Sequence, residues 1–467
     1  MPTLPRPVPF SPPALFAAFV SLAALFMLAA CQMPFGKRAA GPLTPATPMP
    51  KAGPCIVLAL PASGPYAPIA NKIRRGAQLA MRELTGGASK PRLEMVNTEA
   101  PDWLARLTAL PSECAVVGGP LQARGYAQAR AARATEQRAF FTFLPSLEQG
   151  DEGARAWRFF PSPQDQIDTL IAFATNGLNI RAYGAFYPSD AYGARMTGLL
   201  EQSLAARNMV LQKASYDPAN PSSWSDAVAP LINAAQAEGS GAPIPQTAFE
   251  ALFLPDSWKN MDMLTTSLLY NGEDRLVLLG TTLWEQSLSG KLAPNAEKYA
   301  LAVFPGAWNA AQAPRALQAP GTDLWVALGY DFTRFAASLG ITSRLTSPEI
   351  TARAGRAARM IWGMAPITWD STGVAHQKLF LFQASAAGMT PLNLEQFSQA
   401  RSDVLQRAAL RMQGLPAVDA EGNPQAPGIT PAAPQTQTPA SGVLPLSATP
   451  QPSYKLRLPA RPPAPAR

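Results

Sequence analysis

The chain has 467 residues, of which only 15% are charged, and its net charge of +8 is spread thinly along the sequence. Its single histidine, His376, nearly excludes zinc enzymes, histidine-based triads and histidine acid–base catalysis. The sequence also lacks phosphate-binding glycine loops, nucleophile elbows and a long basic helix with interleaved aromatic residues. We therefore expect a non-enzyme with no metal, cofactor or nucleic-acid partner, and with room for two or three domains.

The first 31 residues resemble a bacterial lipoprotein signal sequence. One basic residue, Arg6, precedes an apolar run that ends in Leu28-Ala29-Ala30-Cys31. The run has the length of a signal-peptide core and is short for a membrane span. We expect removal of residues 1–30 and lipidation at Cys31; the alternative is a signal anchor with an incidental cysteine. Gln32, by resemblance to Gram-negative lipoproteins, favours the outer membrane over the inner, with the protein facing the periplasm.

Two proline-rich segments flank the part that should be globular. Residues 31–54 predict a semi-extended tether. Residues 416–467 contain thirteen prolines in 52 positions and show no apolar periodicity, so this tail should be disordered or polyproline-like.

The stretch from Cys55 to Leu84 predicts the first strand, turn and helix. Ile56 to Leu60 is an unbroken apolar run of strand length, and the apolar residues after the turn recur at helical spacing. In a parallel sheet such a turn lies at the carboxyl edge, where ligands bind. The alternative is an ordinary surface turn of any α/β protein.

Short apolar strands then alternate with helices in two successive sets. In the first set the strand candidates are Arg92–Val96, Cys114–Gly118 and Ala139–Leu144. In the second they are Tyr183–Tyr187, Ala251–Leu254 and Leu276–Leu279, after a strong helix start at Ser162-Pro163-Gln164-Asp165. The pattern predicts an α/β protein with doubly wound parallel sheets in two lobes and a cleft between them.

Cys55 and Cys114 are predicted to form a disulfide. Both begin apolar strands, and the first and third strands of a doubly wound sheet are neighbours. Neighbouring strands lie about 4.8 Å apart, close to bridging reach, and an exported protein meets an oxidising compartment.

Seven segments carry a family resemblance: SGPYA, VVGGP, RFFPSPQDQ, SDAYGARM, LLGTTLW, ALGYD and GMAPITWDSTG. Their order resembles type I periplasmic binding proteins of the leucine/isoleucine/valine-binding class, over roughly Cys55 to Gly388. The resemblance implies two Rossmann-like lobes joined by three crossing strands, with the ligand between the lobes. It puts the crossings near Phe160, Leu283 and His376. The N-terminal lobe would comprise 55–160 plus 284–375, and the C-terminal lobe 161–283 plus 376–410.

Two functions follow from the resemblance. The first is an envelope-anchored, non-catalytic ligand-binding lipoprotein, similar to the substrate-binding component of an amino-acid-type ABC transporter, with a small-molecule ligand and an ABC permease as partners. The second is an envelope regulator of peptidoglycan synthesis. Residues 250–256 and 279–284 resemble the outer-membrane activators of penicillin-binding proteins, whose partner is a peptidoglycan synthase. The activators' helical N-terminal repeat domain is not visible in this sequence.

The resemblance also implies ligand contacts from loops at the carboxyl ends of the strands. These are Ser63, Tyr66, Gln122, Thr142 and Ser146 on the first lobe, and Tyr192 and Asp256 on the second. Helix N-termini beside these turns favour a carboxylate or other anion. The alternative for Tyr192 is a packing role, and turns recruit polar residues such as Ser63 and Gln122 for their own reasons.

One departure from the family bears on the ligand. Family members that bind free amino acids place a hydroxyl residue a few positions after the Gly-Pro turn, where this chain has Ala123. We therefore expect leucine, isoleucine and valine to bind weakly or not at all.

Overall fold

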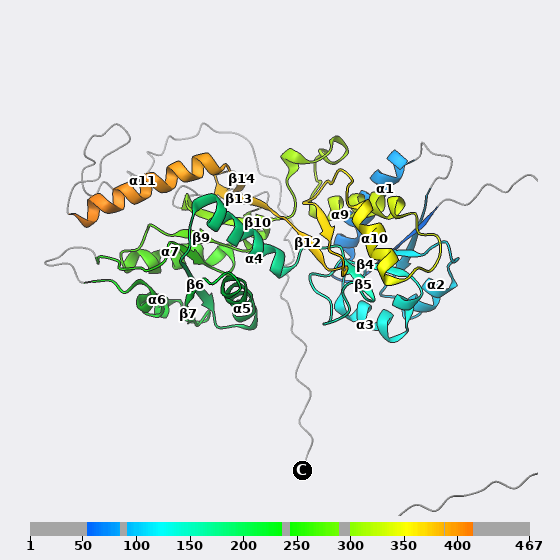
Figure 1. Ribbon diagram of the computed structural model, residues 1–467, viewed down its shortest axis with the longest axis horizontal. Coiled ribbons are helices and arrows are strands. Elements are labelled where there is room, and N and C mark those ends of the chain that lie inside the picture. Colours follow the sequence, from blue (N-terminus) through cyan, green and yellow to red (C-terminus); the bar gives the residue numbers. More distant parts are fainter. Residues whose placement is uncertain (1–53, 85–90, 236–242, 289–298, 387, 414–467) are drawn as a thin grey trace, which may run out of the picture. The chain divides into compact units, whose positions relative to one another are not determined.

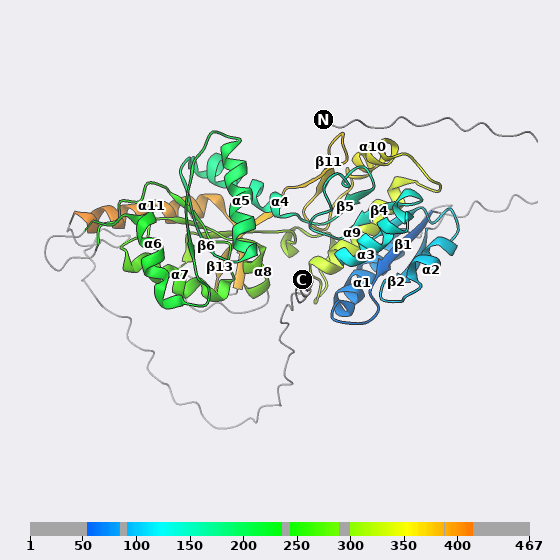
Figure 2. The same ribbon diagram turned by 90° about the horizontal axis from the view of Figure 1, so that it is seen from below.

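The computed structural model describes residues 54–84, 91–235, 243–288, 299–386 and 388–413. The predicted signal peptide, the Cys31 lipidation site, all of the predicted tether except Pro54, and the predicted tail lie outside the described residues. The described chain forms two lobes, each built around its own sheet, which can be followed by their labels in Figure 1 and, turned by 90°, in Figure 2.

The first lobe contains a five-stranded parallel sheet in the order β2-β1-β3-β4-β5. The strands are β1 (Cys55–Leu60), β2 (Arg92–Asn97), β3 (Val116–Gly118), β4 (Ala139–Thr142) and β5 (Ala156–Arg158). All six residues of β1 are buried, because separate apolar clusters cover the two faces of the sheet. A continuous apolar run therefore becomes a central strand rather than an alternating one.

Five helices and a hairpin complete this lobe. They are α1 (Ala67–Glu83), α2 (Trp103–Ala109), α3 (Ala123–Ala131), α9 (Leu324–Leu339), α10 (Ser347–Ala357), β11 (Ile367–Trp369) and β12 (Ala375–Gln377). Helices α1 and α9 meet backbone to backbone at two glycines. A Cβ on Gly76 would lie 1.9 Å from the Val326 carbonyl oxygen, and one on Gly329 would lie 1.9 Å from that of Ile73. Only glycine permits this approach.

A disulfide joins the first lobe's strands β1 and β3. Cys55 opens β1, and Cys114 lies two residues before β3, which pairs with β1 in parallel from Ile56 and Val116 onward. The two Cα atoms are 4.3 Å apart and the sulfur atoms 2.05 Å apart. The structure thus joins the two cysteines that were predicted to pair.

The second lobe contains a seven-stranded mixed sheet in the order β14-β13-β10-β9-β8-β6-β7. The strands are β6 (Tyr183–Pro188), β7 (Leu211–Tyr216), β8 (Ala251–Phe253), β9 (Val277–Leu279), β10 (Ala302–Gly306), β13 (Phe380–Ser385) and β14 (Gly388–Pro391). The first five are parallel to one another, β13 is antiparallel to β10, and β14 is antiparallel to β13. The helices are α4 (Pro163–Ala172), α5 (Ala191–Ala205), α6 (Trp224–Ile232), α7 (Met261–Tyr270), α8 (Thr282–Leu288) and α11 (Leu394–Met412).

The structure corrects one predicted boundary, the return to the first lobe near Leu283. Helix α8 instead packs in the second lobe, where Trp284 is fully buried. Strand β10 then pairs with β9, with Ala302 opposite Leu278. The apolar run that forms β10 adds one more strand to the second sheet, so the return follows Gly306. The other two crossings lie between β5 and α4, and between β12 and β13.

Among the helices of the described part of the chain, none combines the length and the apolar content needed to cross a bilayer.

Candidate functional site

The first predicted ligand loop is the turn between β1 and α1. Ser63 is exposed, and Tyr66, the residue that precedes α1, has 39% of its surface exposed. The side-chain oxygen of Asn97, at the end of β2, accepts hydrogen bonds from the Ala62 and Glu99 N–H groups at 2.9 and 3.1 Å. Asn97 thus holds together two loops at the carboxyl edge of the first sheet, a role that the sequence pattern did not indicate.

The second predicted loop follows β3, and its polar groups bond one another. Gln122 donates from Nε2 to Glu99 Oε1 at 3.1 Å and accepts from Arg124 Nε at 2.5 Å. Arg124 also forms an ion pair with Glu99. Both ends of the Gln122 amide are therefore occupied within the lobe, and the cation that could hold an anionic ligand already has a carboxylate.

The third predicted pair of ligand residues lies at the carboxyl end of β4, with Thr142 as the last residue of the strand and Ser146 in the loop that follows. Thr142 is 0% exposed, and its hydroxyl has no hydrogen-bond partner among the described residues. Ser146 is exposed. A solute at this edge could reach Ser146 directly but not Thr142, which is part of the packed interior.

On the second lobe, Tyr192 lies in the first turn of α5. Its hydroxyl donates to Thr281 Oγ1, just after β9, at 3.1 Å. Burial raises the pKa of Tyr192, so the phenol stays protonated at neutral pH. The neighbouring Thr282 N–H donates to Gln166 Oε1 of α4 at 3.1 Å. The edge is therefore closed by hydrogen bonds between α4, α5 and the start of α8.

Asp256, after β8, is also occupied. It accepts hydrogen bonds from the Tyr216 hydroxyl, from Asn260 Nδ2 at 2.8 Å and from the Ser257 N–H at 2.6 Å. Burial, and then the hydrogen bond to Asp256, raise the pKa of Tyr216. This carboxylate joins the ends of β7 and β8 to the short helix at Trp258–Asn260, which is a structural role.

Glu285 of α8 is a carboxyl group that the sequence pattern did not single out. No hydrogen bond or ion pair joins it to another described residue, and desolvation raises its pKa to about 7. The carboxyl lies over Gly306 at the end of β10, where a Cβ would come within 3.0 Å of Glu285 Oε2. A desolvated acid that has no partner among the described residues and lies at the ligand edge of a sheet is a candidate binding group.

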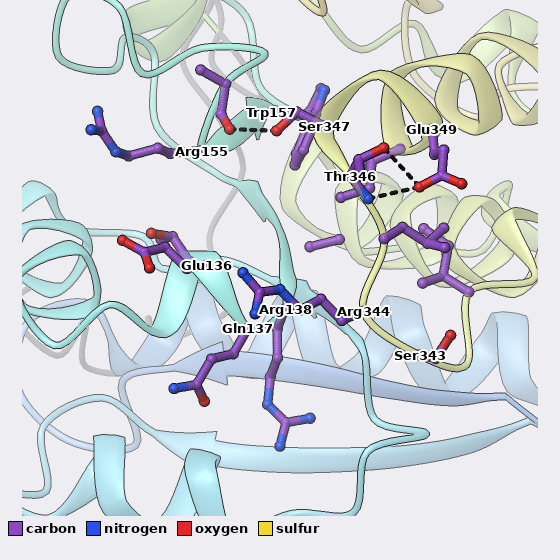
Figure 3. A pocket seen from close by; sticks show the side chains of 16 residues that line it. Glu136, Gln137, Arg138, Arg155, Trp157, Ser343, Arg344, Thr346, Ser347 and Glu349 are labelled. Carbon is purple, nitrogen blue, oxygen red and sulfur yellow. Dashed lines mark hydrogen bonds between the residues drawn. The ribbon is translucent and has the colours of Figure 1, made fainter.

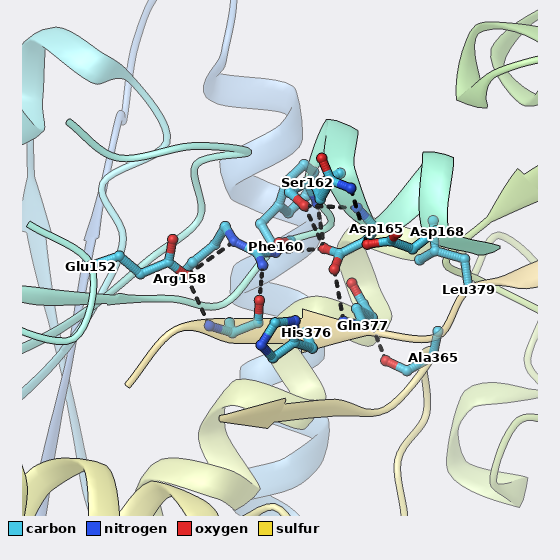
Figure 4. A network of polar contacts seen from close by, with 12 residues as sticks. Glu152, Arg158, Phe160, Ser162, Asp165, Asp168, Ala365, His376, Gln377 and Leu379 are labelled. Carbon is cyan, nitrogen blue, oxygen red and sulfur yellow. Dashed lines mark hydrogen bonds and ion pairs between the residues drawn. The ribbon is translucent and has the colours of Figure 1, made fainter. Parts of the chain in front are cut away.

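A buried polar network lies where the chain crosses between lobes (Figure 4). Arg158 donates to Asp165 Oδ2 at 2.7 Å and also to the Ala375 carbonyl. The side chains of Arg158 and Asp165 are only 4% and 6% exposed. Asp165 Oδ1 accepts the Gln377 N–H at 2.9 Å, and Asp165 also closes the capping box of α4 with Ser162. One carboxylate therefore joins two of the three crossing segments.

The largest of three cavities whose linings are described encloses about 590 Å³ and is shown in Figure 3. It lies at the amino ends of β4 and β5, which is the edge of the first sheet opposite to the predicted ligand loops. Its lining includes Arg138, Trp157 and Arg344. A second cavity, of about 450 Å³, lies beside His376 and Gln377. The linings of these three cavities include none of the seven predicted ligand residues. Within the described ranges, no cluster of three or more metal-ligating side chains occurs.

Comparisons with known proteins identify the fold. No family profile and no curated protein sequence match this chain. Solved structures do: a Rhodospirillum rubrum protein assigned to the branched-chain amino acid ABC transporters has a TM-score of 0.54 at 12% identity, over 73% of this chain and 100% of that one. Full-length LpoA from Haemophilus influenzae has a TM-score of 0.52 at 16% identity, over 74% of this chain but 60% of LpoA.

A third similar structure is the ABC transporter substrate-binding protein from Desulfitobacterium hafniense in complex with Leu. It has a TM-score of 0.50 at 16% identity, over 73% of this chain and 100% of that one. At these identities the likeness shows the fold alone, and the fold is that of the type I periplasmic binding proteins. The predicted fold class is thereby confirmed.

Proposed function

We propose, from this fold, that the chain is a non-catalytic binding protein of the bacterial cell envelope whose partner is another macromolecule, a peptidoglycan synthase of the penicillin-binding class. Both kinds of protein that share the fold, substrate-binding proteins and LpoA, are binding or regulatory proteins. LpoA is described as a regulator of PBP1A.

The observation that carries the proposal is the state of the predicted ligand groups. Gln122 is bonded to Glu99 and Arg124, Asp256 to Tyr216 and Asn260, and Tyr192 to Thr281. A small ligand would have to replace these bonds, each typically worth about 0.5–1.5 kcal/mol net. Tyr66 and Ser146 remain exposed on their loops, so they are available for contact with the surface of another protein.

The test is binding and stimulation of a bifunctional penicillin-binding protein by the purified chain. We expect saturable binding and a faster rate of glycan polymerisation or cross-linking. Tyr66→Ala should weaken binding about tenfold, because truncating a contact aromatic typically costs more than about 1 kcal/mol. Tyr270→Ala, which removes a 71% exposed tyrosine from α7 of the other lobe, is the matched control. Absence of binding by the unaltered chain would refute the proposal.

The envelope location rests on the lipobox resemblance at Cys31, and it is part of the proposal. A thioether-linked diacylglycerol with a further acyl chain would anchor the mature chain at Cys31, and the predicted tether of residues 31–54 would separate the lobes from the membrane. The Cys31→Ala variant should therefore no longer partition into the detergent phase. Retention of the variant on membranes would contradict lipid anchoring.

A second candidate is a solute receptor for an ABC permease, favoured by Glu285. An ammonium group placed against this carboxyl would give the desolvated acid a partner and restore its ionised form. Native mass spectrometry of gently purified protein tests the candidate, because a bound solute would appear as a mass increment. Loss of that increment in Glu285→Gln, with the fold intact, would identify the site.

A further inference from the structure

An arginine-rich surface covers the end of α9, the following loop and α10 of the first lobe. Between residues 334 and 361 the sequence has five arginines and one acidic residue, Glu349. We call this set the α10 arginine surface: Arg334, Arg344, Arg353, Arg356 and Arg359. The buried side of α10 is formed by Ile350, Thr351, Ala354 and Ala357. Of the two arginines within α10, Arg356 is exposed, and Arg353 is half-buried and reaches back to the end of α9.

None of these five arginines forms an ion pair with a carboxylate of the described residues. Arg334 donates to the Ile361 carbonyl at 2.9 Å and lies 5.1 Å from the Tyr330 ring centroid. Arg353 donates to the carbonyls of Leu339 and Gly340 at 3.1 and 2.6 Å. For the other three, Arg344, Arg356 and Arg359, the described part of the chain supplies neither a hydrogen bond nor an ion pair.

Two of the acidic groups close to this surface are engaged in hydrogen bonds to the backbone, and a third, Glu136, lines the same cavity as Arg344. Glu349 accepts from the Thr346 N–H and hydroxyl at 2.8 and 2.7 Å in the capping box of α10. The acid of α9, Asp331, is 0% exposed and accepts from the Gly363 and Met364 N–H groups. Elsewhere exposed arginines do pair, as Arg106 does with Asp102. The positive charge of the α10 arginine surface is therefore left for a partner outside the chain.

An exposed apolar residue lies among these cations. Ile361 is 74% exposed, and its backbone carbonyl accepts the hydrogen bond from Arg334, which places Ile361 beside that arginine and two residues after Arg359. The next residue, Trp362, is half-buried and donates from its indole to the Ala358 carbonyl. At the interface of a bilayer, guanidinium groups can bind lipid phosphates while a neighbouring exposed aliphatic side chain inserts among the acyl chains.

We propose that the α10 arginine surface docks on an anionic lipid bilayer, with Ile361 inserted below the headgroups. Charge complementarity favours a membrane rich in acidic headgroups, since a basic residue near such a surface strengthens binding about fivefold. The aliphatic side chain distinguishes this partner from a soluble polyanion, which offers nothing apolar. Docking at this face of the first lobe does not depend on the proposed synthase partner.

The experiment is vesicle co-sedimentation of residues 32–467, which retain every described element and lack the apolar leader. Vesicles of phosphatidylcholine mixed with phosphatidylglycerol are compared with pure phosphatidylcholine vesicles, at low and at physiological ionic strength. We expect binding to the mixed vesicles only, weakened by salt. The triple variant Arg344→Gln, Arg356→Gln, Arg359→Gln should lose on the order of a hundredfold in affinity. These three side chains have no partners within the described chain, so the fold should survive.

The matched control carries the same change of charge elsewhere: Arg133→Gln, Arg195→Gln, Arg315→Gln, all exposed positions without side-chain partners in the described part. It should bind like the unaltered chain, apart from a small long-range effect. Ile361→Asn should lose about tenfold, whereas Val210→Asn, at a 78% exposed site of the other lobe, should not change binding. Equal losses in the two triple variants, or binding to soluble polyaspartate but not to vesicles, would overturn the proposal.

Discussion

Two arginine–carboxylate ion pairs of this chain differ in how far they are buried. At the crossing between the lobes, Arg158 and Asp165 are 4% and 6% exposed, 2.7 Å apart and bonded to the segments around them (Figure 4). At the carboxyl edge of the first sheet, Arg124 and Glu99 are 64% and 22% exposed. Water solvates the second pair but not the first.

The difference in exposure predicts how much each pair contributes to the stability of the fold. Removing one partner of a buried pair leaves an uncompensated charge, which is costly. Removing one partner of an exposed pair changes stability little, because water replaces the lost contact. The crossing network should therefore fix the connection between the lobes, whereas the exposed Arg124–Glu99 pair should contribute little to the stability of the fold.

The largest expected effect is at the crossing. Asp165→Asn keeps the shape of the side chain but removes the nearer countercharge, at 2.7 Å, from the buried Arg158 guanidinium, which then keeps only its 3.2 Å ion pair with Glu152. We expect a loss of about 3 kcal/mol in the free energy of unfolding, measured by urea denaturation. Asp168→Asn, on the same helix but at a 43% exposed side chain, is the control and should lose less than about 1 kcal/mol. Equal losses would mean that burial is not the deciding factor.

The next effect is a pH dependence at Glu285. Its pKa is raised from 4.5 to about 7 in the folded chain, so folding disfavours the ionised form. The free energy of unfolding of the native chain should decrease as pH rises from about 4.5 to 7, because Glu285 ionises more readily in the unfolded chain. This decrease should be absent from Glu285→Gln. At about pH 8 the variant should be more stable by about 1–3 kcal/mol, and at about pH 4 the two should agree.

Asp331 complicates this titration, because burial raises its pKa to about 7 as well. It remains in both proteins, so the difference between the two stability curves isolates Glu285. A difference that does not change with pH would show that Glu285 is solvated in the folded chain.

A smaller effect is expected at the second sheet edge. Tyr192→Phe removes the hydrogen bond to Thr281 and should cost about 0.5–1.5 kcal/mol of stability, seen as a lower melting temperature. If a solute does bind at this edge, Tyr192→Ala should weaken it at least about tenfold while the fold stays intact. A solute whose affinity is unchanged in that variant would bind elsewhere.

The smallest effect is at the exposed pair. Glu99→Gln should change the free energy of unfolding by less than about 1 kcal/mol. The amide oxygen introduced by this substitution can still accept from Gln122 and Arg124, so circular dichroism should show the same fold. A loss as large as that of Asp165→Asn would show that the exposed pair also holds the fold together.

Local patterns predicted the local structure well. The all-apolar run at β1 and the capping box at Ser162 and Asp165 both occur where the sequence indicated, because each depends on neighbouring residues. The return crossing was placed too early, since the motif after β9 gave no sign that a further strand, β10, would join the same sheet. The bond from Arg158 to Ala375 spans 217 residues, and no local pattern could indicate it.

The candidate site was harder to predict than the fold. The resemblance located the loops correctly at the carboxyl ends of the strands, but it could not tell whether their polar groups were free. Gln122 and Glu99 are 23 residues apart, and Asp256 and Tyr216 are 40 apart, so their pairing depends on the finished sheets. Glu285 was missed because it lies over Gly306 of β10, and the segment 284–375, which contains both, was predicted to belong to the first lobe.

The claim that Gln122, Tyr192 and Asp256 are already bonded within the chain, and so do not hold a free amino acid, is tested most directly by titration calorimetry of the purified chain with leucine, isoleucine and valine. Helix α3 begins at Ala123, the position where the resemblance places a carboxylate-binding hydroxyl, and the preceding amide, Gln122, is bonded at both ends. A site with one unmet partner loses about 1–3 kcal/mol, roughly ten- to a hundredfold in affinity. We expect no saturable heat at micromolar concentrations of any of the three. Low-micromolar binding of one of them would contradict the claim.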